Sequence, residues 1–503
     1  MVPRLFHKLS LFQYFLILVL IILILVMSSY LWNGDVLVHT DVARDLLVVR
    51  DMVENKQITL IGPRSSIPGV FHGALWYYIY VIPFVLSHGD PLLMGWFWWF
   101  CVLLASGLFL YFNHLLTKNI TVSLLMAILF ILLELPGSAG PTNTFFANLF
   151  AFVPFFLWWK WYQKPQLKLA ISGWLIMGLL AQFQMAFVVP LVVTWSPIFL
   201  WRIFKQKRWQ QLWSILFFFL PFTTFFLFDL RHDFLQTNSF LTYIQTAKSN
   251  LSFYLRLTER IQQAFYYGIN LFGLKNWWIN LLVWFYFLFL VWRNKNNELK
   301  KFCLMAGYWY FSWWILTLAF SGTVWSFYFD PFLSILLLVI GMIANRSSLA
   351  KWLLTILVVF AIFQNRGNFS YSPDRFNSSS WKLLSNIAKD SLNEPGVGYF
   401  LYSQDQFAYP LKYAFAFYQQ ENPHSQAVHF SKQPVTILVK ATDNPDNPWS
   451  TSKDWQLSKL HINLEPVYTK AYPYGYILEK YLLDEKTLNE PVDPNLVRGL
   501  EFR

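Results

Sequence analysis

The first apolar block of the chain reads Leu11-Phe-Gln-Tyr-Phe-Leu-Ile-Leu-Val-Leu-Ile-Ile-Leu-Ile-Leu-Val-Met-Ser-Ser-Tyr-Leu31 and contains no charged residue. About 20 consecutive apolar residues cross a bilayer as a helix, so this block is long enough to span one. The whole 503-residue chain has the same character, with 56% hydrophobic and only 13% charged residues, whereas soluble proteins average about 25% charged residues. The composition therefore excludes a soluble enzyme and indicates a polytopic membrane protein.

Ten further apolar blocks of comparable length follow the first. They lie at about 92–112, 119–135, 145–162, 168–185, 187–203, 209–229, 275–292, 302–320, 325–343 and 349–364. An additional block, 73–88, is shorter, contains Pro83 and is crowded with tryptophan and tyrosine. No small-residue cleavage site follows the first block, so we expect it to be retained as a helix with a cytoplasmic N-terminus.

The positions of lysine and arginine decide whether block 73–88 also crosses. Cytoplasmic loops of membrane proteins carry an excess of these residues. If 73–88 does not cross, the basic clusters in the short loops between Lys118 and Lys351 all fall in the cytoplasm, and if it does cross, they all move outside. We therefore predict eleven crossings of the plasma membrane, with 73–88 as an interfacial or re-entrant helix and the C-terminus extracytoplasmic.

The charge distribution also separates the C-terminal tail from the rest of the chain. Residues 366–503 hold 14 Lys or Arg and 15 Asp or Glu, whereas residues 1–365 carry a net charge of +13 that lies mainly in short loops, so no nucleic-acid partner is indicated. The tail alternates short apolar runs (Val397–Tyr402, Val435–Val439 and Tyr474–Leu478) with helix-like stretches (Trp381–Ala388 and Gln406–Tyr418). This pattern is typical of a small α/β domain. We predict two domains: an all-α transmembrane domain at 1–365 and a soluble extracytoplasmic α/β domain at 366–503.

Acidic residues gather directly after the first apolar block. The stretch from Gly34 to Glu54 contains Asp35, Asp41, Asp45, Asp51 and Glu54. Helical periodicity puts Asp41, Arg44 and Asp45 on one face, opposite an apolar face, and so predicts an amphipathic interfacial helix with a wet acidic side. Asp41 opens this helix as either an N-cap or a catalytic base. Arg44 and Asp45 also fit solvated partners on an exposed face.

The strip that follows, residues 60–78, combines turn signals with polar side chains. Gly62-Pro63 and Pro68-Gly69 are typical of turns, and we expect them to fold the strip back toward the membrane. His72 is a candidate hydrogen-bond donor or metal ligand, with a structural role as the alternative. Candidate phosphate donors in this strip are Arg64, Ser65 and Ser66.

A second outer segment opens where the span at 209–229 is predicted to end. It begins Phe228-Asp-Leu-Arg-His-Asp-Phe234. Arginine matches a phosphate group bidentately, so Arg231, with His232 beside it, is a candidate for binding an anionic lipid head group. Ordinary interfacial anchoring is the alternative interpretation.

Several motifs follow one another in a fixed order: Thr40-Asp41-x-Ala43-Arg44-Asp45, then Gly62-Pro63, then Phe71-His72-Gly73-x-Leu75-x-Tyr77-Tyr78. Together they resemble bacterial GT-C glycosyltransferases, the membrane relatives of protein O-mannosyltransferases and of the lipid A aminoarabinose transferase. Phe228-Asp-Leu-Arg-His and Tyr328-Phe-x-Pro331 also look like recurring elements of this group. The resemblance covers roughly residues 1–365.

The resemblance implies an inverting transfer of a sugar from polyprenyl phosphate to an acceptor on the outer face of the membrane. Asp41 falls on the family's first acidic residue, which acts as the general base. Many members have a second acid next to it, where this chain has Val42, and Asp45 is therefore the second catalytic candidate. Candidate donor-phosphate residues are Arg231, His232 and Arg64. Candidate residues for acceptor binding or site lining are Arg44, His72, Tyr77 and Tyr328.

The implied partners are a polyprenyl-phosphate sugar donor and a lipid, glycan or protein acceptor. The sequence indicates no certain cofactor, and a divalent metal stays an open alternative. A transporter or lipid flippase is the second hypothesis for function. It predicts ionisable residues at mid-membrane, whereas the predicted span interiors are nearly free of charge. A non-catalytic scaffold is the third hypothesis, and it leaves the acidic cluster unexplained.

Overall fold

The computed structural model describes residues 9–246, 252–266, 277–293, 297–320, 322–443, 446 and 451–500. Contacts between residues divide the chain into two compact units. The helical unit comprises Met1–Ser29, Thr59–Trp76 and Trp98–Ser370, and the tail unit comprises Tyr30–Ile58, Tyr77–Phe97 and Tyr371–Arg503. The acidic stretch after the first apolar block therefore belongs to the same unit as the C-terminal tail, while a domain boundary at residue 365 stays a prediction.

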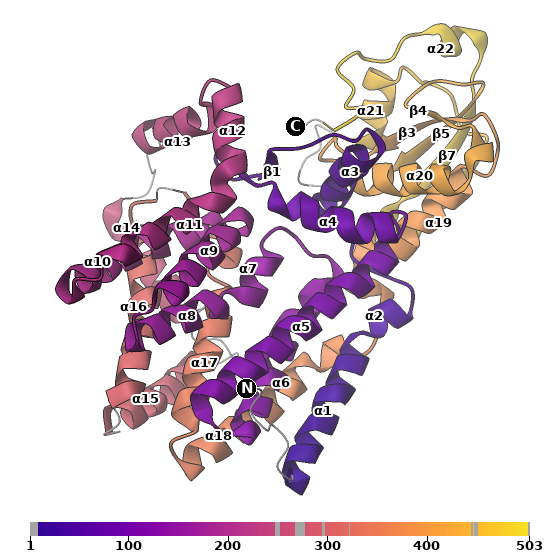
Figure 1. The fold of residues 1–503 in the computed structure, drawn as a ribbon. Coiled ribbons are helices and arrows are strands. Elements are labelled where there is room, and N and C mark those ends of the chain that lie inside the picture. Colours follow the sequence, from indigo (N-terminus) through magenta and orange to yellow (C-terminus); the bar gives the residue numbers. More distant parts are fainter. Residues whose placement is uncertain are drawn as a thin grey trace. The chain divides into compact units, whose positions relative to one another are not determined.

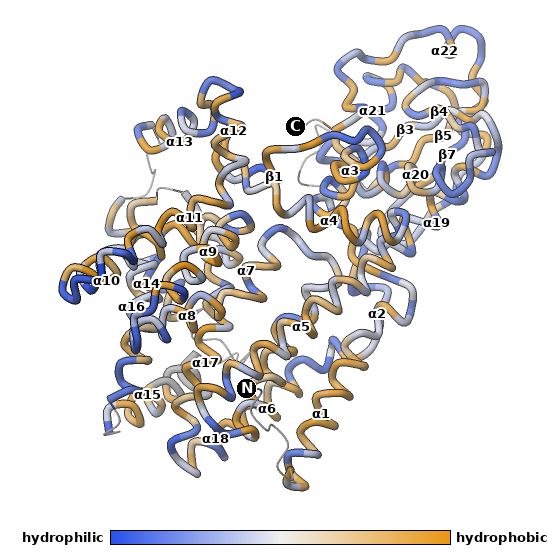
Figure 2. The backbone as a smooth tube through the Cα atoms, in the orientation of Figure 1, coloured by the Kyte–Doolittle hydropathy of each residue, from blue (hydrophilic) through white to orange (hydrophobic). Residues whose placement is uncertain are grey.

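The helical unit consists mainly of apolar helices, which Figure 1 labels and Figure 2 colours by hydropathy. Its helices are α1 (Leu11–Met27), α6 (Ile120–Glu134), α7 (Phe145–Phe150), α8 (Phe152–Gln163), α9 (Leu167–Phe183), α10 (Met185–Gln206), α11 (Leu216–Phe219), α12 (Thr223–Arg231), α13 (Leu235–Thr246), α14 (Phe253–Tyr266), α15 (Trp277–Arg293), α16 (Asn297–Thr317), α17 (Phe332–Ala344) and α18 (Ser348–Gln364). Helix α5 (Pro91–Thr117) begins in the tail unit and continues in the helical unit.

Five helical stretches in the described part of the chain are long and apolar enough to cross a membrane. They are Pro91–Thr117, Ile120–Ala139, Met185–Gln206, Trp209–Arg231 and Ser348–Asn368. Shorter apolar helices are Leu11–Met27, Leu75–Leu86, Leu167–Phe183 and Phe332–Ala344. The chain is thus a multi-pass membrane protein, and the count of eleven crossings stays a prediction.

The predicted apolar blocks coincide with helical segments, but several of them are divided or shortened. Block 209–229 alternates 3₁₀ segments with the short helices α11 and α12. Block 145–162 is divided into α7 and α8, and block 325–343 becomes α-helical only from Phe332, directly after Pro331. Proline favours a helix start because its fixed φ suits the first turn and its missing N–H has no partner there. The beginning of block 275–292 lies outside the described residues.

Aromatic side chains fill the core of the helical unit. Trp158 of α8 lies edge-on to Trp174 of α9, with ring centroids 5.0 Å apart, and edge-on to Phe199 of α10 at 5.5 Å. Such pairs stabilise a core beyond the area they bury. Gly173 permits this packing, because a Cβ at that position would lie 2.7 Å from Trp158.

A small hairpin of the helical unit precedes α4 (Leu75–Leu86), which belongs to the tail unit from Tyr77 onward. Strand β1 (Ile61–Arg64) pairs antiparallel with β2 (Phe71–Gly73). The turn predicted at Gly62-Pro63 is wrong, since both residues lie within β1, where a Cβ on Gly62 would approach the Gly73 carbonyl oxygen to 2.2 Å. The turn at Pro68-Gly69 is confirmed, and Gly69 has a φ of +77°, which favours glycine.

The C-terminal part of the tail unit is an α/β domain, as predicted. Its five-stranded sheet has the order β4-β3-β5-β7-β6. Strands β3, β4 and β5 run parallel, and β7 runs antiparallel to both of its neighbours, β5 and β6. The strands are β3 (Gly398–Tyr402), β4 (Val428–His429), β5 (Val435–Lys440), β6 (Tyr468–Ala471) and β7 (Ile477–Leu482). The predicted runs gave β3 and β5 but started the last strand too early, and β4 and β6 were too short to stand out.

The tail unit also contains several helices, of which α3 (Thr40–Glu54) carries most of the acidic stretch. They are α2 (Ser29–Trp32, beginning at the unit boundary), α3, α19 (Trp381–Ser391), α20 (Tyr409–Glu421), α21 (Ser452–Lys459) and α22 (Glu485–Asn489). Helix α20 packs against both α19 and α3. Because of this contact, α3 is largely covered rather than lying on an open surface.

Candidate functional site

The N-terminus of α3 carries the most exposed candidate acid. His39 is the N-cap, and its Nδ1 accepts a hydrogen bond from the Asp41 backbone N–H at 3.2 Å. Asp41 therefore lies within the first helical turn and is not the N-cap, so that interpretation is wrong. Its side chain is 56% exposed, and the partial positive charge of a helix N-terminus stabilises a carboxylate there.

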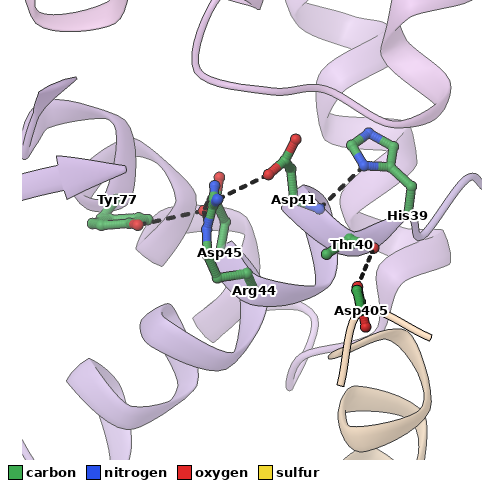
Figure 3. Close-up of polar contacts among 7 residues, drawn as sticks. All are labelled: His39, Thr40, Asp41, Arg44, Asp45, Tyr77 and Asp405. Carbon is green, nitrogen blue, oxygen red and sulfur yellow. Dashed lines mark hydrogen bonds and ion pairs between the residues drawn. The ribbon is translucent and has the colours of Figure 1, made fainter. Parts of the chain in front are cut away.

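Arg44 connects Asp41 in the first turn of α3 with Asp45 in the second turn. One guanidinium nitrogen, Nη1, lies 2.8 Å from Asp41 Oδ1, while Nη2 and Nε donate to Asp45 Oδ1 at 2.8 and 3.0 Å. The Tyr77 hydroxyl donates to the same Asp45 oxygen at 3.4 Å (Figure 3). Burial lowers the pKa of the Arg44 guanidinium, but the negative charges around it, chiefly Asp45, outweigh burial and hold that pKa well above its usual range.

The acidic face predicted for α3 is only partly exposed to solvent, because the Asp45 side chain is just 1% exposed. Val48, one turn further on, is buried as well, and so is the opposite apolar face of the helix. Periodicity gave the correct angular position of Asp45 but not its environment, because the Tyr77 hydroxyl of α4 and the Arg44 guanidinium cover the Asp45 carboxylate. Of the two candidate bases, Asp41 has the carboxylate that solvent reaches.

A loop of the tail also reaches the start of α3. The Thr40 hydroxyl donates to Asp405 Oδ2 at 3.5 Å, the long end of the hydrogen-bond range (Figure 3). The other Asp405 oxygen accepts from the backbone N–H of Phe407 at 3.0 Å and so organises its own loop. Sequence analysis missed Asp405 because more than 350 residues separate it from Thr40.

In the helical unit, the polar strip 60–78 is held at Ser66 and Phe71. The Ser66 and Tyr328 hydroxyls are 3.1 Å apart, so Tyr328 contacts the turn of the hairpin. The Phe71 backbone N–H donates to Gln236 Oε1 at 2.9 Å. Of the predicted residues, Arg64 is exposed at the end of β1, and His72 lies half-buried in the middle of β2.

The turn between α12 and α13 is organised by Asp229, which sequence analysis quoted but did not select. This buried carboxylate accepts hydrogen bonds from the Gln236 backbone N–H at 2.8 Å, from the Thr237 backbone N–H at 3.2 Å and from the Thr237 hydroxyl at 2.6 Å. Since Gln236 also binds Phe71, Asp229 fixes the turn and the hairpin strand β2 together. Asp229 could have been identified from the sequence, because it is an acidic residue at the end of an apolar span and a buried carboxylate needs hydrogen-bond partners nearby.

Arg231 and His232 lie at the C-terminal end of α12 and are both exposed. His232 stacks on Phe228 with ring centroids 4.2 Å apart, and its Nδ1 lies 2.8 Å from the Phe228 carbonyl oxygen. Arg231 makes no side-chain hydrogen bond or ion pair within the part of the chain that the structure describes. Its five N–H donors are thus available to an anion.

The described residues contain no group of three or more His, Cys, Asp and Glu side chains arranged to hold a metal ion. A metal site carried over from the family therefore has no matching donor set among these residues, and we derive no step through a metal. Cys101 and Cys303 are free thiols in helices α5 and α16.

The helical unit and the attached α/β tail together form a GT-C glycosyltransferase-like fold. A solved structure that shares this fold is that of ArnT from Cupriavidus metallidurans bound to undecaprenyl phosphate, with a TM-score of 0.60, 11% sequence identity, and coverage of 93% of this chain and 98% of that one. No family model matches the sequence, and no curated protein matches it either. At such low identity, the similarity shows the fold and leaves the chemistry to be argued from the residues.

Proposed function

We propose that the protein is an integral membrane glycosyltransferase that moves a sugar from a polyprenyl-phosphate donor to an acceptor hydroxyl or amine. The observation that carries this proposal is the exposed Asp41 carboxylate in the first turn of α3, within a GT-C-like fold. The undecaprenyl phosphate bound to ArnT supports a lipid-linked donor of the same chemical class.

Asp41 acts as the general base in the proposed reaction. It takes the proton from the acceptor hydroxyl or amine, whose lone pair attacks the anomeric carbon of the sugar. The bond between that carbon and the phosphate oxygen breaks, the electron pair leaves with the lipid phosphate, and the anomeric configuration inverts. A positioned base of this kind typically contributes about 10²–10⁴-fold to the rate.

Asp45 supports this role without taking the proton itself. Its buried carboxylate holds the Arg44 guanidinium, and Arg44 in turn contacts the Asp41 carboxylate. Such support keeps a catalytic group in one geometry, which matters because small displacements cost large factors in rate. Tyr77 contributes through its hydrogen bond to Asp45.

Charge develops on the departing lipid phosphate, and Arg231 is the group proposed to stabilise it. Its exposed guanidinium has no partner among the described residues and matches a phosphate group bidentately. His232 and Arg64 are proposed as further phosphate contacts. His72 and Tyr328 are proposed to line the site, since they lie in or contact the hairpin of β1 and β2.

The proposal also includes the topology expected from the positive charges of the short loops. The N-terminus is cytoplasmic, the chain crosses the membrane eleven times, and the first outer loop and the tail face outward. Both substrates then meet the protein from the outer leaflet, where a lipid-linked sugar and an extracytoplasmic acceptor are available.

The direct test is sugar transfer by the purified protein in lipid nanodiscs, supplied with a mixture of polyprenyl-phosphate sugars. Asp41→Asn is compared with Glu54→Gln, which removes another exposed carboxylate from the same helix. We expect donor consumption to fall at least 100-fold in Asp41→Asn and to change little in Glu54→Gln. Full transfer by a folded Asp41→Asn protein would contradict the proposal.

A further inference from the structure

Asp35 is a fully buried carboxylate that the proposed chemistry does not use. Its side chain is 0% exposed. Oδ2 accepts hydrogen bonds from the Ser380 hydroxyl at 2.7 Å and the Tyr371 hydroxyl at 3.0 Å, and Oδ1 accepts from the backbone N–H groups of Lys382 and Val36, both at 3.0 Å. A buried carboxylate is costly unless its oxygens are well satisfied, so this site needs its donors in place.

Three of these four donors come from the first residues of the C-terminal tail. Ser380 has a second role there, because it is the N-cap of α19 and its hydroxyl oxygen accepts from the Leu383 backbone N–H. Burial and the neighbouring Asp35 carboxylate raise the pKa of the Tyr371 hydroxyl to about 12. Asp35 therefore joins the chain after the first apolar block to a defined structure at the beginning of the tail.

The backbone beside Asp35 is paired with the same tail segment. The Val38 N–H donates to the Ser379 carbonyl oxygen at 2.8 Å, and the Trp381 N–H donates to the Val36 carbonyl oxygen at 3.0 Å. Leu37 and Ser380 form the antiparallel bridge between these two bonds. The next residue, His39, is the N-cap of α3, and Asp41 follows two residues later.

We propose that Asp35 is a positioning residue for the transfer reaction, and that through residues 36–38 it fixes the first turn of α3 and the direction of the Asp41 carboxylate. This inference rests on the proposed role of Asp41 as the base. It gives the tail a function in the reaction: residues 371–382 hold the segment that leads into the catalytic helix.

The test compares full-length Asp35→Asn with Asp374→Asn, in lipid nanodiscs. Asp374 is an exposed carboxylate of the same tail segment, and it accepts a hydrogen bond from Tyr474. We expect Asp35→Asn to lower kcat 10- to 100-fold with donor KM within twofold of wild type. We also expect faster hydrogen exchange at residues 39–45 and unchanged exchange in β3 and β5. Asp374→Asn is expected to match wild type in both readouts.

Wild-type kcat in Asp35→Asn would overturn the inference, and so would loss of exchange protection throughout β3 and β5, which indicates a general structural role. If Asp35→Asn does not fold, Tyr371→Phe removes one hydrogen bond from the same carboxylate, and a kcat loss at unchanged KM is expected there too. The exchange measurement needs no turnover. If Asp41→Asn remained fully active, the proposed function would fail while the exchange at residues 39–45 would still report whether Asp35 holds this turn.

Discussion

The two arginines that have a role in the proposed reaction, Arg44 on α3 and Arg231 on α12, have opposite environments. Arg44 is largely buried, and two carboxylates and a tyrosine surround its guanidinium. Arg231 is exposed and has no partner among the described residues. The charge of Arg44 is already used inside the protein, so Arg44 organises its helix, whereas Arg231 can bind an anion from outside. Sequence position alone had made both of them site candidates.

The largest effect on stability is expected from removing a charged partner of the buried Arg44. Asp45→Ala leaves the Arg44 guanidinium buried with only Asp41 as a charged partner, and removing one member of a buried ion pair costs about 3 kcal/mol or more. Hydrogen exchange of the α3 amides should therefore accelerate about 100-fold. The double variant Arg44→Met/Asp45→Leu removes both charges and should lose much less protection. Equal protection in Asp45→Ala and wild type would show that the pair does not hold the helix.

A smaller effect, on lipid binding, is expected from substituting Arg231, which has no partner among the described residues. Arg231→Ala should weaken binding of polyprenyl phosphate about tenfold, because a hydrogen bond to a charged group is lost, and should leave the melting temperature unchanged. Arg231→Lys keeps the charge without the planar guanidinium, so its affinity for polyprenyl phosphate should lie between those of wild type and Arg231→Ala. Binding can be measured by titrating the purified protein with undecaprenyl phosphate. An unchanged affinity at unchanged stability would remove Arg231 from the phosphate site.

The smallest effect is expected from removing an exposed ion pair of the tail. This change tests whether burial is the reason that the ion pairs of Arg44 stabilise α3. Asp390 of α19 accepts hydrogen bonds from Lys470 and from the Tyr472 hydroxyl. Burial raises the pKa of this carboxyl, but these two donors outweigh burial and hold the pKa below its usual 3.8. Exposed ion pairs contribute little, so Asp390→Asn should lower the melting temperature at pH 7 by less than about 2 °C.

The pH dependence of this pair has a defined sign. A carboxyl whose pKa is lower in the folded protein contributes stability that is fully present above the usual pKa and is lost as the pH falls through the folded value. The difference between wild type and Asp390→Asn should therefore be constant from pH 7 to about pH 5, begin to shrink near about pH 4, and disappear once the pH is below the folded pKa. A difference that grows on acidification would contradict this sign.

The sequence was sufficient for features that depend on neighbouring residues. The apolar blocks predicted the helices, and the alternating runs of the tail predicted an α/β domain with β3 and β5. The amphipathic periodicity of Asp41, Arg44 and Asp45 predicted the helix that became α3. These features follow from periodicity and from end signals within a few residues.

Contacts between distant segments could not be predicted in the same way. The Asp45 carboxylate is buried beside Tyr77, which lies 32 residues further along the chain, and Asp35 finds its partners in residues 371–382. Gly62 lies in a strand because the Gly73 backbone approaches it closely, although Gly62-Pro63 has the composition of a turn. In each case the partner is distant in sequence or its approach depends on packing, and neither leaves a local signal.

We propose that the Asp41 carboxylate takes the proton of the acceptor and does not hold the donor. The most direct measurement is to follow, for Asp41→Asn and Glu54→Gln in nanodiscs, both undecaprenyl-phosphate affinity and the single-turnover rate of donor cleavage with acceptor present. We predict that Asp41→Asn binds the lipid within twofold of wild type and cleaves donor at least 100-fold more slowly, while Glu54→Gln matches wild type in both. Donor cleavage by Asp41→Asn at the wild-type rate would show that Asp41 is not the general base.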